Sequence, residues 1–305
     1  MNRRNLFARA LLFFCGSVPF LARSAIGWIL GYSFGLLPTR ERRIAQLQLQ
    51  VFLQTRQAAR LTRRAFANAG RTLLESMNLS PALKSSRYTI TPHGWDNVAP
   101  LLASSRPVVA LTAHTGNWDL LGAYVVAQGV EVTTIGREAR NHFAQSLLAG
   151  IREQYGIHTI WRSDKGAIKQ LTSQLKQGNI IAALIDQDTR VKSTFTPFFG
   201  RPAKTPSSLV ALGRRHNALF ISAFIFRTGW RTFSLFIEPF TDEASEEEIL
   251  NLYNARLEQY IRLYPDQWVW FHKRWRTETN GNTLSSSQYL SFLERQLTQS
   301  DDVRY

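Results

Sequence analysis

The stretch PVVALTAHTGNWDLLGAYVVAQGVEVTTIG, residues 107–136, decides the fold class. Residues 107–113 have the apolar character of a buried strand, and residues 117–129 read as a helix closed by Gly129. Residues 130–136 return to strand-like sequence. A strand, a helix and a second strand in this order are typical of a parallel β-α-β unit. The stretch therefore predicts an α/β domain.

The same alternation continues toward the C-terminus. A helix is predicted near residues 141–155, and the next helix begins at Ser163 or Asp164, which are suitable N-cap residues. Four further strands are predicted, at IHTIW (157–161), NIIAALID (179–186), ALFISAFIFR (218–227) and TFSLFIEPF (232–240). Residues 81–278 are thus expected to form a single α/β domain with a central, largely parallel or mixed sheet flanked by helices.

His114 stands where the first strand ends and the helix begins. Open α/β sheets place their binding sites at this end of parallel strands. Asp119 follows five positions later, so the first helical turn can return its carboxylate to the imidazole. A carboxylate on one ring nitrogen fixes the tautomer and lets the other nitrogen accept a proton. The pair is a candidate base and orienter; a capping role for Asp119 is the alternative.

The N-terminal region combines positive charge with apolar runs. Residues 1–74 hold twelve Arg, no Lys and one acid, Glu41, out of a net charge of +15 for the chain. Residues 10–22 and 24–38 are uncharged, but each is shorter than the roughly 20 residues that span a bilayer. We expect residues 5–38 to form a membrane-inserted helix or broken hairpin on the cytoplasmic side. A cleaved signal sequence and buried core helices are the alternatives.

The rest of the composition narrows the class. With 44% hydrophobic and 19% charged residues the chain is expected to fold, and a lone Cys15 excludes an intrachain disulfide. The expected division is an anchor at 1–40, a basic amphipathic helical region at 41–80, the α/β domain, and a polar tail at 279–305 with a loosely attached helix. Apolar runs among the arginines favour an anionic membrane over a nucleic acid as partner.

Four ordered blocks carry a family resemblance. They are GRTLLE (70–75), HTGNWD (114–119), DQDTRVKSTFTPFFGRPAKTPSSLVALGRRHNA (186–218) and QWVWFHKRW (267–275). They resemble the bacterial lipid A late acyltransferases, the lauroyl- and myristoyl-transferring branch of the lysophospholipid acyltransferase superfamily. The resemblance implies that His114 is the general base and Asp119 its partner. It also implies direct attack of an acceptor hydroxyl on an acyl thioester, with no acyl-enzyme. No cofactor is expected, and no metal, because the sequence shows no evident third ligand beside Asp186 and Asp188.

The resemblance also points to substrate-binding residues. Asn117 and Trp118 complete the first block. Candidates at the strand ends and in the later blocks are Arg137, Arg152, Asp186, Asp188, Phe199, Gly200 and Arg201. Arginines suit the phosphates of a lipid head group or a phosphopantetheine carrier, although solvated charge is the commoner role. Asp186 and Asp188 close the strand at 179–186, so by the same strand-end rule they should lie near His114, although they can instead cap a loop. The Phe-Gly pair can form a rigid turn, and His272 is expected to be structural.

The functional expectation is acyl transfer to a lipid A precursor at the cytoplasmic face of the bacterial inner membrane. The donor would be acyl carrier protein, or alternatively acyl-CoA, and the acceptor a glycolipid. Asp119 stands where this branch usually has Glu, so another membrane lipid or glycolipid is the alternative acceptor. A non-catalytic protein that binds anionic membranes is the alternative from another class, and a nucleic-acid binder is disfavoured.

Overall fold

The two most apolar predicted strands lie side by side at the centre of the structure, a computed structural model that describes residues 3–139 and 141–302. β2 (Val108–Thr112) pairs in parallel with β5 (Ile180–Leu184), with Ala110 opposite Ala182. All five residues of β2 are buried. A strand covered on both faces is apolar throughout, which explains why this part of the sequence lacks polar alternation.

Seven strands of the described chain form one sheet in the order β1-β9-β8-β2-β5-β3-β4. The remaining bounds are β1 (Thr89–His93), β3 (Val132–Gly136), β4 (His158–Trp161), β8 (Leu219–Arg227) and β9 (Thr232–Pro239). Only the β8–β9 pairing is antiparallel, so the predicted largely parallel, mixed sheet is confirmed. β1 was not predicted from the sequence, because its alternately exposed residues and Pro92 lack the signal of a buried strand.

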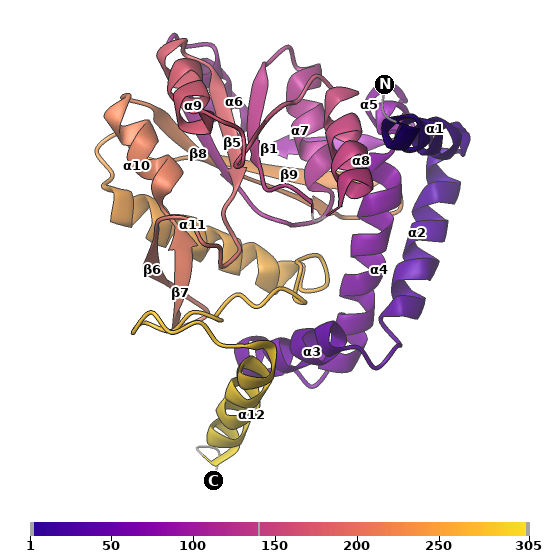
Figure 1. The fold of residues 1–305 in the computed structure, drawn as a ribbon, viewed down its shortest axis with the longest axis vertical. Helices are drawn as coiled ribbons and strands as arrows, with labels where there is room; N and C mark the ends of the chain where they lie inside the picture. The colour runs from indigo at the N-terminus through magenta and orange to yellow at the C-terminus, as the bar shows by residue number, and fades with distance from the viewer. Residues whose placement is uncertain (1–2, 140, 303–305) are drawn as a thin grey trace.

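Helices cover both faces of the sheet (Figure 1). One face packs against α6 (Trp95–Leu102), α7 (Trp118–Ala127) and α8 (His142–Glu153). The other packs against α9 (Ala167–Lys176), α10 (Ser208–Arg215) and α11 (Glu246–Leu263). Successive residues of a strand point to opposite faces, so each central strand contributes to both cores. The predicted α/β class, with helices flanking the sheet, is confirmed.

A two-stranded hairpin packs beside α11 and the C-terminal segment. It consists of β6 (Ser193–Phe198) and β7 (Arg201–Pro206), joined by Phe199 and Gly200. Both turn residues have positive φ, 50° and 70°. A two-residue hairpin loop of this type suits the twist of antiparallel strands, and glycine adopts it without a steric penalty.

The N-terminal third is helical. Its elements are α1 (Arg3–Ser17), α2 (Phe20–Phe34), α3 (Arg40–Leu53), α4 (Ala58–Ser76) and α5 (Ser80–Lys84). Among the described helices, no single one is long and apolar enough to cross a bilayer. The consecutive pair Ala10–Ser17 and Phe20–Phe34, bent by 108°, meets the length and composition requirement only together. The pair exposes large apolar side chains: Phe13, Phe14, Ile26, Ile29, Leu30 and Phe34.

Helix α2 lies directly on α4 through a glycine seam, formed by Gly27, Gly31 and Gly70. A Cβ atom on Gly70 would stand 2.4 Å from the backbone oxygen of Gly27, and one on Gly31 would stand 2.2 Å from that of Phe66. Such distances leave no room for any side chain. The two backbones therefore touch, and α2 is fixed to α4 along this seam.

The C-terminal helix α12 (Ser286–Asp302) packs against α3. Tyr289 and Leu293 are fully buried, and the Tyr289 hydroxyl donates to Gln48 Oε1 at 2.8 Å. The expected helix is present, but the expectation that it is loosely attached was wrong. The two apolar residues that fix it are separated by one helical turn, a weak signal in an otherwise polar segment.

Candidate functional site

The turn between β2 and α7 presents His114 at the carboxyl end of the central strand. Asn117 closes this turn as the N-cap of α7, because its Oδ1 accepts from the backbone N–H of Leu120 at 3.0 Å. The Gly116 N–H donates to the backbone oxygen of Gln267 at 2.8 Å. The catalytic turn, residues 113–118, is thus held by its own helix and by the C-terminal segment.

The imidazole of His114 pairs with Asp186, which follows the neighbouring strand β5. Nδ1 of His114 lies 2.8 Å from Asp186 Oδ1, and the backbone N–H of His114 donates to Oδ2 at 3.0 Å. The indole N–H of Trp268 also donates to Oδ2, at 2.9 Å. Three donors therefore converge on one fully buried carboxylate.

Electrostatics favour an ionised Asp186. Burial alone raises the pKa of this carboxyl, but the bonds and charge of His114 and the bond from Trp268 outweigh it and lower the pKa to about 2. An ionised carboxylate accepts the Nδ1–H of His114, which leaves Nε2 as the proton acceptor. The His114 side chain is 25% exposed, whereas that of Asp186 is 0% exposed. The imidazole of His114 is thus accessible from outside, whereas the carboxylate that bonds it is not.

Asp119 does not take the position expected of the orienter. Among the described residues, the carboxylate bonded to His114 is Asp186 rather than Asp119. Asp119 is half-buried in the first turn of α7, close to Arg152 and Ser76. Burial raises its pKa, and the nearby charges of Arg152 and His114 only partly oppose this. The hydrogen bond expected between Asp119 and His114 is absent from the described contacts. Because β5 ends beside β2, Asp186 lies against the His114 ring and takes this place. A catalytic role for Asp119 stays a prediction.

The raised pKa of Asp119 gives an expected stability change. Ionisation of this carboxyl costs folding free energy once the pH exceeds its ordinary pKa of 3.8, so D119N is expected to raise Tm at pH 7 by about 2 °C. The gain should vanish below pH 3.8, where the wild-type carboxyl is protonated in both states. Thermal unfolding followed by circular dichroism from pH 3 to 8 measures this. A lower Tm for D119N at pH 7 would contradict it.

A narrow apolar cavity of ≈ 70 Å³ runs between the sheet and helices α6 and α7, and its wall includes Trp118, the neighbour of His114. Trp118, Asp119 and Arg152 line it at one end; the Trp118 ring stands edge-on to the His114 ring at 5.1 Å between centroids. Small side chains on adjacent strands, Ala110 and Ala182, leave the space open. Leu102, Val98 and Trp95 of α6 line it as well. Its lining is mostly apolar and suits hydrocarbon better than a polar group.

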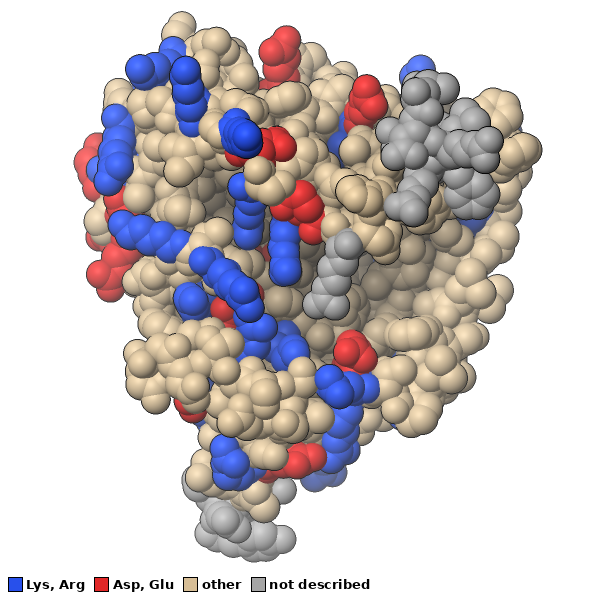
Figure 2. Space-filling model, viewed as in Figure 1, with Lys and Arg blue, Asp and Glu red and all other residues tan. Residues whose placement is uncertain are grey.

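Basic side chains gather near the same ends of the strands. Arg137 follows β3 and Arg162 follows β4; burial and the charge of Arg137 lower the pKa of Arg162, so the two guanidinium groups are neighbours. A second hollow of ≈ 430 Å³ is mainly apolar, carries Arg162, Lys192 and Arg215, and reaches Ile185, the residue before Asp186. Figure 2 shows Lys and Arg side chains along a hollow on this face, whereas the part over α2 is mostly uncharged.

The other predicted residues lie around this centre in different ways. Asp188 ties the C-terminal segment down: its Oδ2 accepts from the Thr277 N–H at 2.8 Å, and its N–H donates to His272 Nε2 at 3.1 Å. Burial lowers the pKa of His272 to about 3, which agrees with a neutral, structural ring. Phe199 packs on Trp270 and Trp275, at the turn of the hairpin.

Gly200 and Arg201 line a separate hollow beside Glu258 and Arg262. The structure does not bring these two residues to the cavity at His114. Substrate contact by Phe199, Gly200 and Arg201 therefore stays a prediction.

Within residues 3–139 and 141–302, no three His, Cys, Asp or Glu side chains are placed to hold a metal ion. Sequence reasoning missed Trp268, whose only signal was its place in the block at 267–275.

Nearly the whole chain is similar in sequence to known acyltransferases. The sequence model of the bacterial lipid A biosynthesis acyltransferases matches residues 5–277. A lipid A biosynthesis acyltransferase of Haemophilus influenzae is 23% identical over 276 residues, which cover 88% of this chain and 86% of that protein. A lipid A biosynthesis palmitoleoyltransferase of Escherichia coli is 24% identical over 195 residues, 62% of each chain.

A phosphatidylinositol mannoside acyltransferase of Mycobacterium tuberculosis is also similar, with 22% identity over 186 residues, 60% of this chain and 58% of that protein. The chain thus spans less than two thirds of some of these relatives. The family match, in contrast, extends from the first apolar helix to beyond the Trp268 segment. This chain belongs to the bacterial lipid A biosynthesis acyltransferase family.

Proposed function

We propose that the chain transfers a fatty acyl group from a thioester to a hydroxyl of a lipid A precursor, with His114 as general base. The observation that carries the proposal is the His114–Asp186 pair, whose imidazole contacts Trp118 in the wall of an apolar cavity. A base fixed by a buried carboxylate is the arrangement that activates a hydroxyl, and the cavity accounts for a hydrocarbon chain at the same place. The family assignment supports this reaction class.

In the proposed reaction, the acceptor hydroxyl gives its proton to His114 Nε2 while its oxygen attacks the thioester carbonyl carbon. Asp186 stabilises the imidazolium that forms. The carbon–sulfur bond then breaks, and the thiolate takes the proton back from Nε2. Arg152 lines the cavity mouth and has a buried Nη1 without a hydrogen-bond partner among the described residues. This nitrogen is available to the carbonyl oxygen as negative charge develops on it.

The distribution of charge supports a donor from solution and an acceptor from the membrane. The second hollow, which carries Arg162 and Lys192, lies apart from the exposed apolar side chains of α1 and α2 (Figures 1 and 2). Phosphopantetheine carries a phosphate and acyl carrier proteins are acidic, so we propose acyl carrier protein as the donor. The apolar helix pair would seat the enzyme on the cytoplasmic face of the inner membrane. No step of this chemistry needs a cofactor.

The acceptor is tested by lipid analysis. Deleting the gene should remove one secondary acyl chain from lipid A, seen as the loss of one acyl mass in mass spectra. An unchanged lipid A pattern with an altered glycolipid would instead support the second candidate, acylation of another membrane glycolipid. The similarity to a phosphatidylinositol mannoside acyltransferase and Asp119 in place of the usual Glu favour that alternative.

Ala182 tests the cavity as the acyl site. Its side chain points into the cavity from β5 and is half-buried, so A182V should narrow the cavity without overpacking the core. A misfit of about one methylene changes kcat/KM by about 10-fold or more, so we expect at least this loss for the longest donor relative to one two carbons shorter. A183V is the control, because Ala183 points to the opposite face. Equal chain-length profiles for A182V and A183V would refute the assignment.

A further inference from the structure

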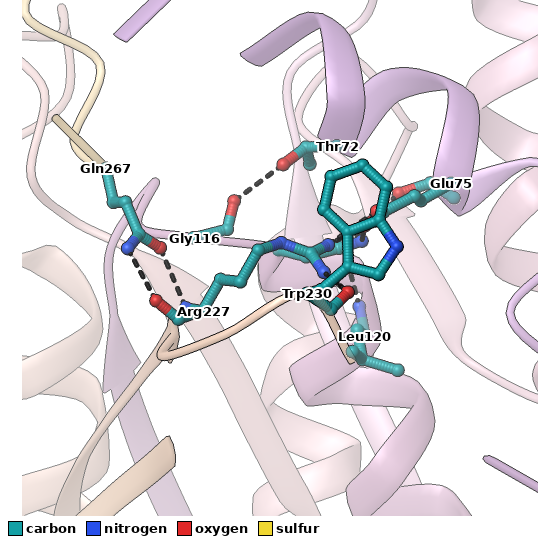
Figure 3. A network of polar contacts seen from close by, with 9 residues as sticks. Thr72, Glu75, Gly116, Leu120, Arg227, Trp230 and Gln267 are labelled. Carbon is teal, nitrogen blue, oxygen red and sulfur yellow. Dashed lines mark hydrogen bonds and ion pairs between the residues drawn. The ribbon is translucent and has the colours of Figure 1, made fainter. Parts of the chain in front are cut away.

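Helix α4 reaches the catalytic turn with two polar side chains, Thr72 and Glu75 (Figure 3). The Thr72 hydroxyl donates to the backbone oxygen of Gly116 at 2.6 Å. Glu75 is fully buried, and its Oε2 accepts from Asn117 Nδ2 at 3.1 Å. Asn117 in turn caps α7 through its other side-chain atom. Thr72 and Glu75 of α4 thus hold Gly116 and Asn117, the two residues that follow His114 and Thr115.

The same carboxylate closes a ring of contacts around the turn. Arg227, at the end of β8, donates to both oxygens of Glu75 at 2.5 Å. The Gln267 side chain holds the backbone N–H and oxygen of Arg227, both at 2.8 Å, and the Gln267 backbone oxygen accepts from the Gly116 N–H. The path from Gly116 through Gln267, Arg227 and Glu75 returns to Asn117. A displacement of any member therefore reaches the turn.

The catalytic turn packs tightly against β8. Gly116 has a φ of +49°, and a Cβ atom there would stand 2.3 Å from the backbone oxygen of Ile225. The turn is thus pressed between β8 on one side and Thr72 and Glu75 of α4 on the other. On its opposite flank α4 carries α2 through the glycine seam. One helix contacts both the apolar N-terminal pair and the turn that presents His114.

We propose that Thr72 and Glu75 are positioning residues for the reaction: they set the place of the catalytic turn, and through it that of the His114 imidazole. The inference rests on the proposed function, because it takes His114 as the base. Neither residue touches the space beside His114 that substrate occupies, so both act through Gly116 and Asn117. The alternative is that they contribute to folding alone. The two possibilities differ in what a mild substitution does to turnover in the folded enzyme.

The decisive comparison is T72V against T72S in the full-length enzyme. Valine keeps the shape of threonine but has a methyl group in place of the hydroxyl, whereas serine keeps the hydroxyl that bonds Gly116. We expect T72V to lower kcat about 10-fold, which corresponds to about 1.4 kcal/mol, with KM within twofold of wild type. T72S should retain most of the wild-type kcat. Equal kcat values for T72V and wild type would overturn the proposal.

A second readout does not depend on turnover. Diethylpyrocarbonate modifies unprotonated imidazole, and the His114 side chain is 25% exposed, so its rate of modification can be followed by peptide mass spectrometry. T72V should change this rate at His114 at least twofold relative to the exposed His158 in the same sample. An unchanged ratio would mean that the hydroxyl does not position the ring. If H114N kept full activity, the proposed function would fail, whatever T72V shows.

Glu75 is tested in the same way, with a control for the loss of an ion pair. E75Q leaves Arg227 without its carboxylate and is expected to lower both kcat and Tm. R106Q removes the surface ion pair between Arg106 and Asp242, whose charged atoms lie 2.6 Å apart, and should leave kcat unchanged. An E75Q enzyme with reduced Tm but wild-type kcat at a temperature where it is folded would refute the positioning role of Glu75. If E75Q does not fold, T72V decides.

Discussion

Replacement of His114 by asparagine is expected to lower kcat by about 10²- to 10⁴-fold, the usual contribution of a general base. The amide side chain of H114N can still bond Asp186, but it offers no nitrogen that takes a proton from a hydroxyl. KM for the thioester should change little, because the apolar cavity does not depend on the imidazole. Transfer of a radiolabelled acyl group to a lipid acceptor in detergent micelles measures both constants.

The control for this variant is H158N, since His158 is exposed on β4, away from the catalytic turn. It should keep the wild-type kcat and the same fraction of protein bound to membranes. H114N turnover within a factor of two of wild type, in protein with an unchanged circular dichroism spectrum, would exclude His114 as the base. The alternative of a non-catalytic membrane-binding protein would then gain support.

The second large effect is expected for D186N. An asparagine at this position turns an NH₂ group toward His114 Nδ1, which moves the ring proton to Nε2 and removes the acceptor. Loss of the correct tautomer lowers kcat by about 10³- to 10⁴-fold in a comparable arrangement. D119N should cost less, because Asp119 does not bond the ring in this structure. A larger kcat loss for D119N than for D186N would return the orienter role to Asp119.

Stability separates the two carboxylates as well. The pKa of Asp186 is lowered from 3.8 to about 2, so its ionised form stabilises the folded state above pH 3.8, and this contribution is lost as the pH falls from 3.8 toward 2. D186N should therefore lose about 2 kcal/mol at pH 7. D119N should instead increase the free energy of unfolding at pH 7, since the pKa of Asp119 is raised in the folded state. Urea unfolding of both variants at pH 7 should show opposite signs.

The sequence predicts the central sheet well because its strands are buried on both faces. Runs such as residues 107–113 and 179–186 are apolar, short and bounded by turn residues, so composition alone identifies them. β1 and the β6–β7 hairpin lack this signal. β1 is a half-exposed edge strand with a proline, and the hairpin turn contains Phe199 at a φ where asparagine or glycine is usual.

The site shows a similar division between local and long-range information. An argument from spacing compares only residues that are close in sequence. It therefore selects Asp119, five positions away, as the partner of His114. The bonded partner lies 72 residues away and is brought in by the pairing of β2 with β5. The strand-end rule did predict that Asp186 lies near His114. Nothing in the sequence pattern predicts that Trp268 donates to the same carboxylate, or that Glu75 contacts Asn117.

The glycine seam between α2 and α4 has a practical consequence for handling the protein. A chain shortened to begin at Arg40 would lack α2. The backbone of α4 around Phe66 and Gly70, which α2 now covers, would then be exposed. The N-terminal helices are therefore no removable tether, and preparations intended for assay or crystallisation should retain them.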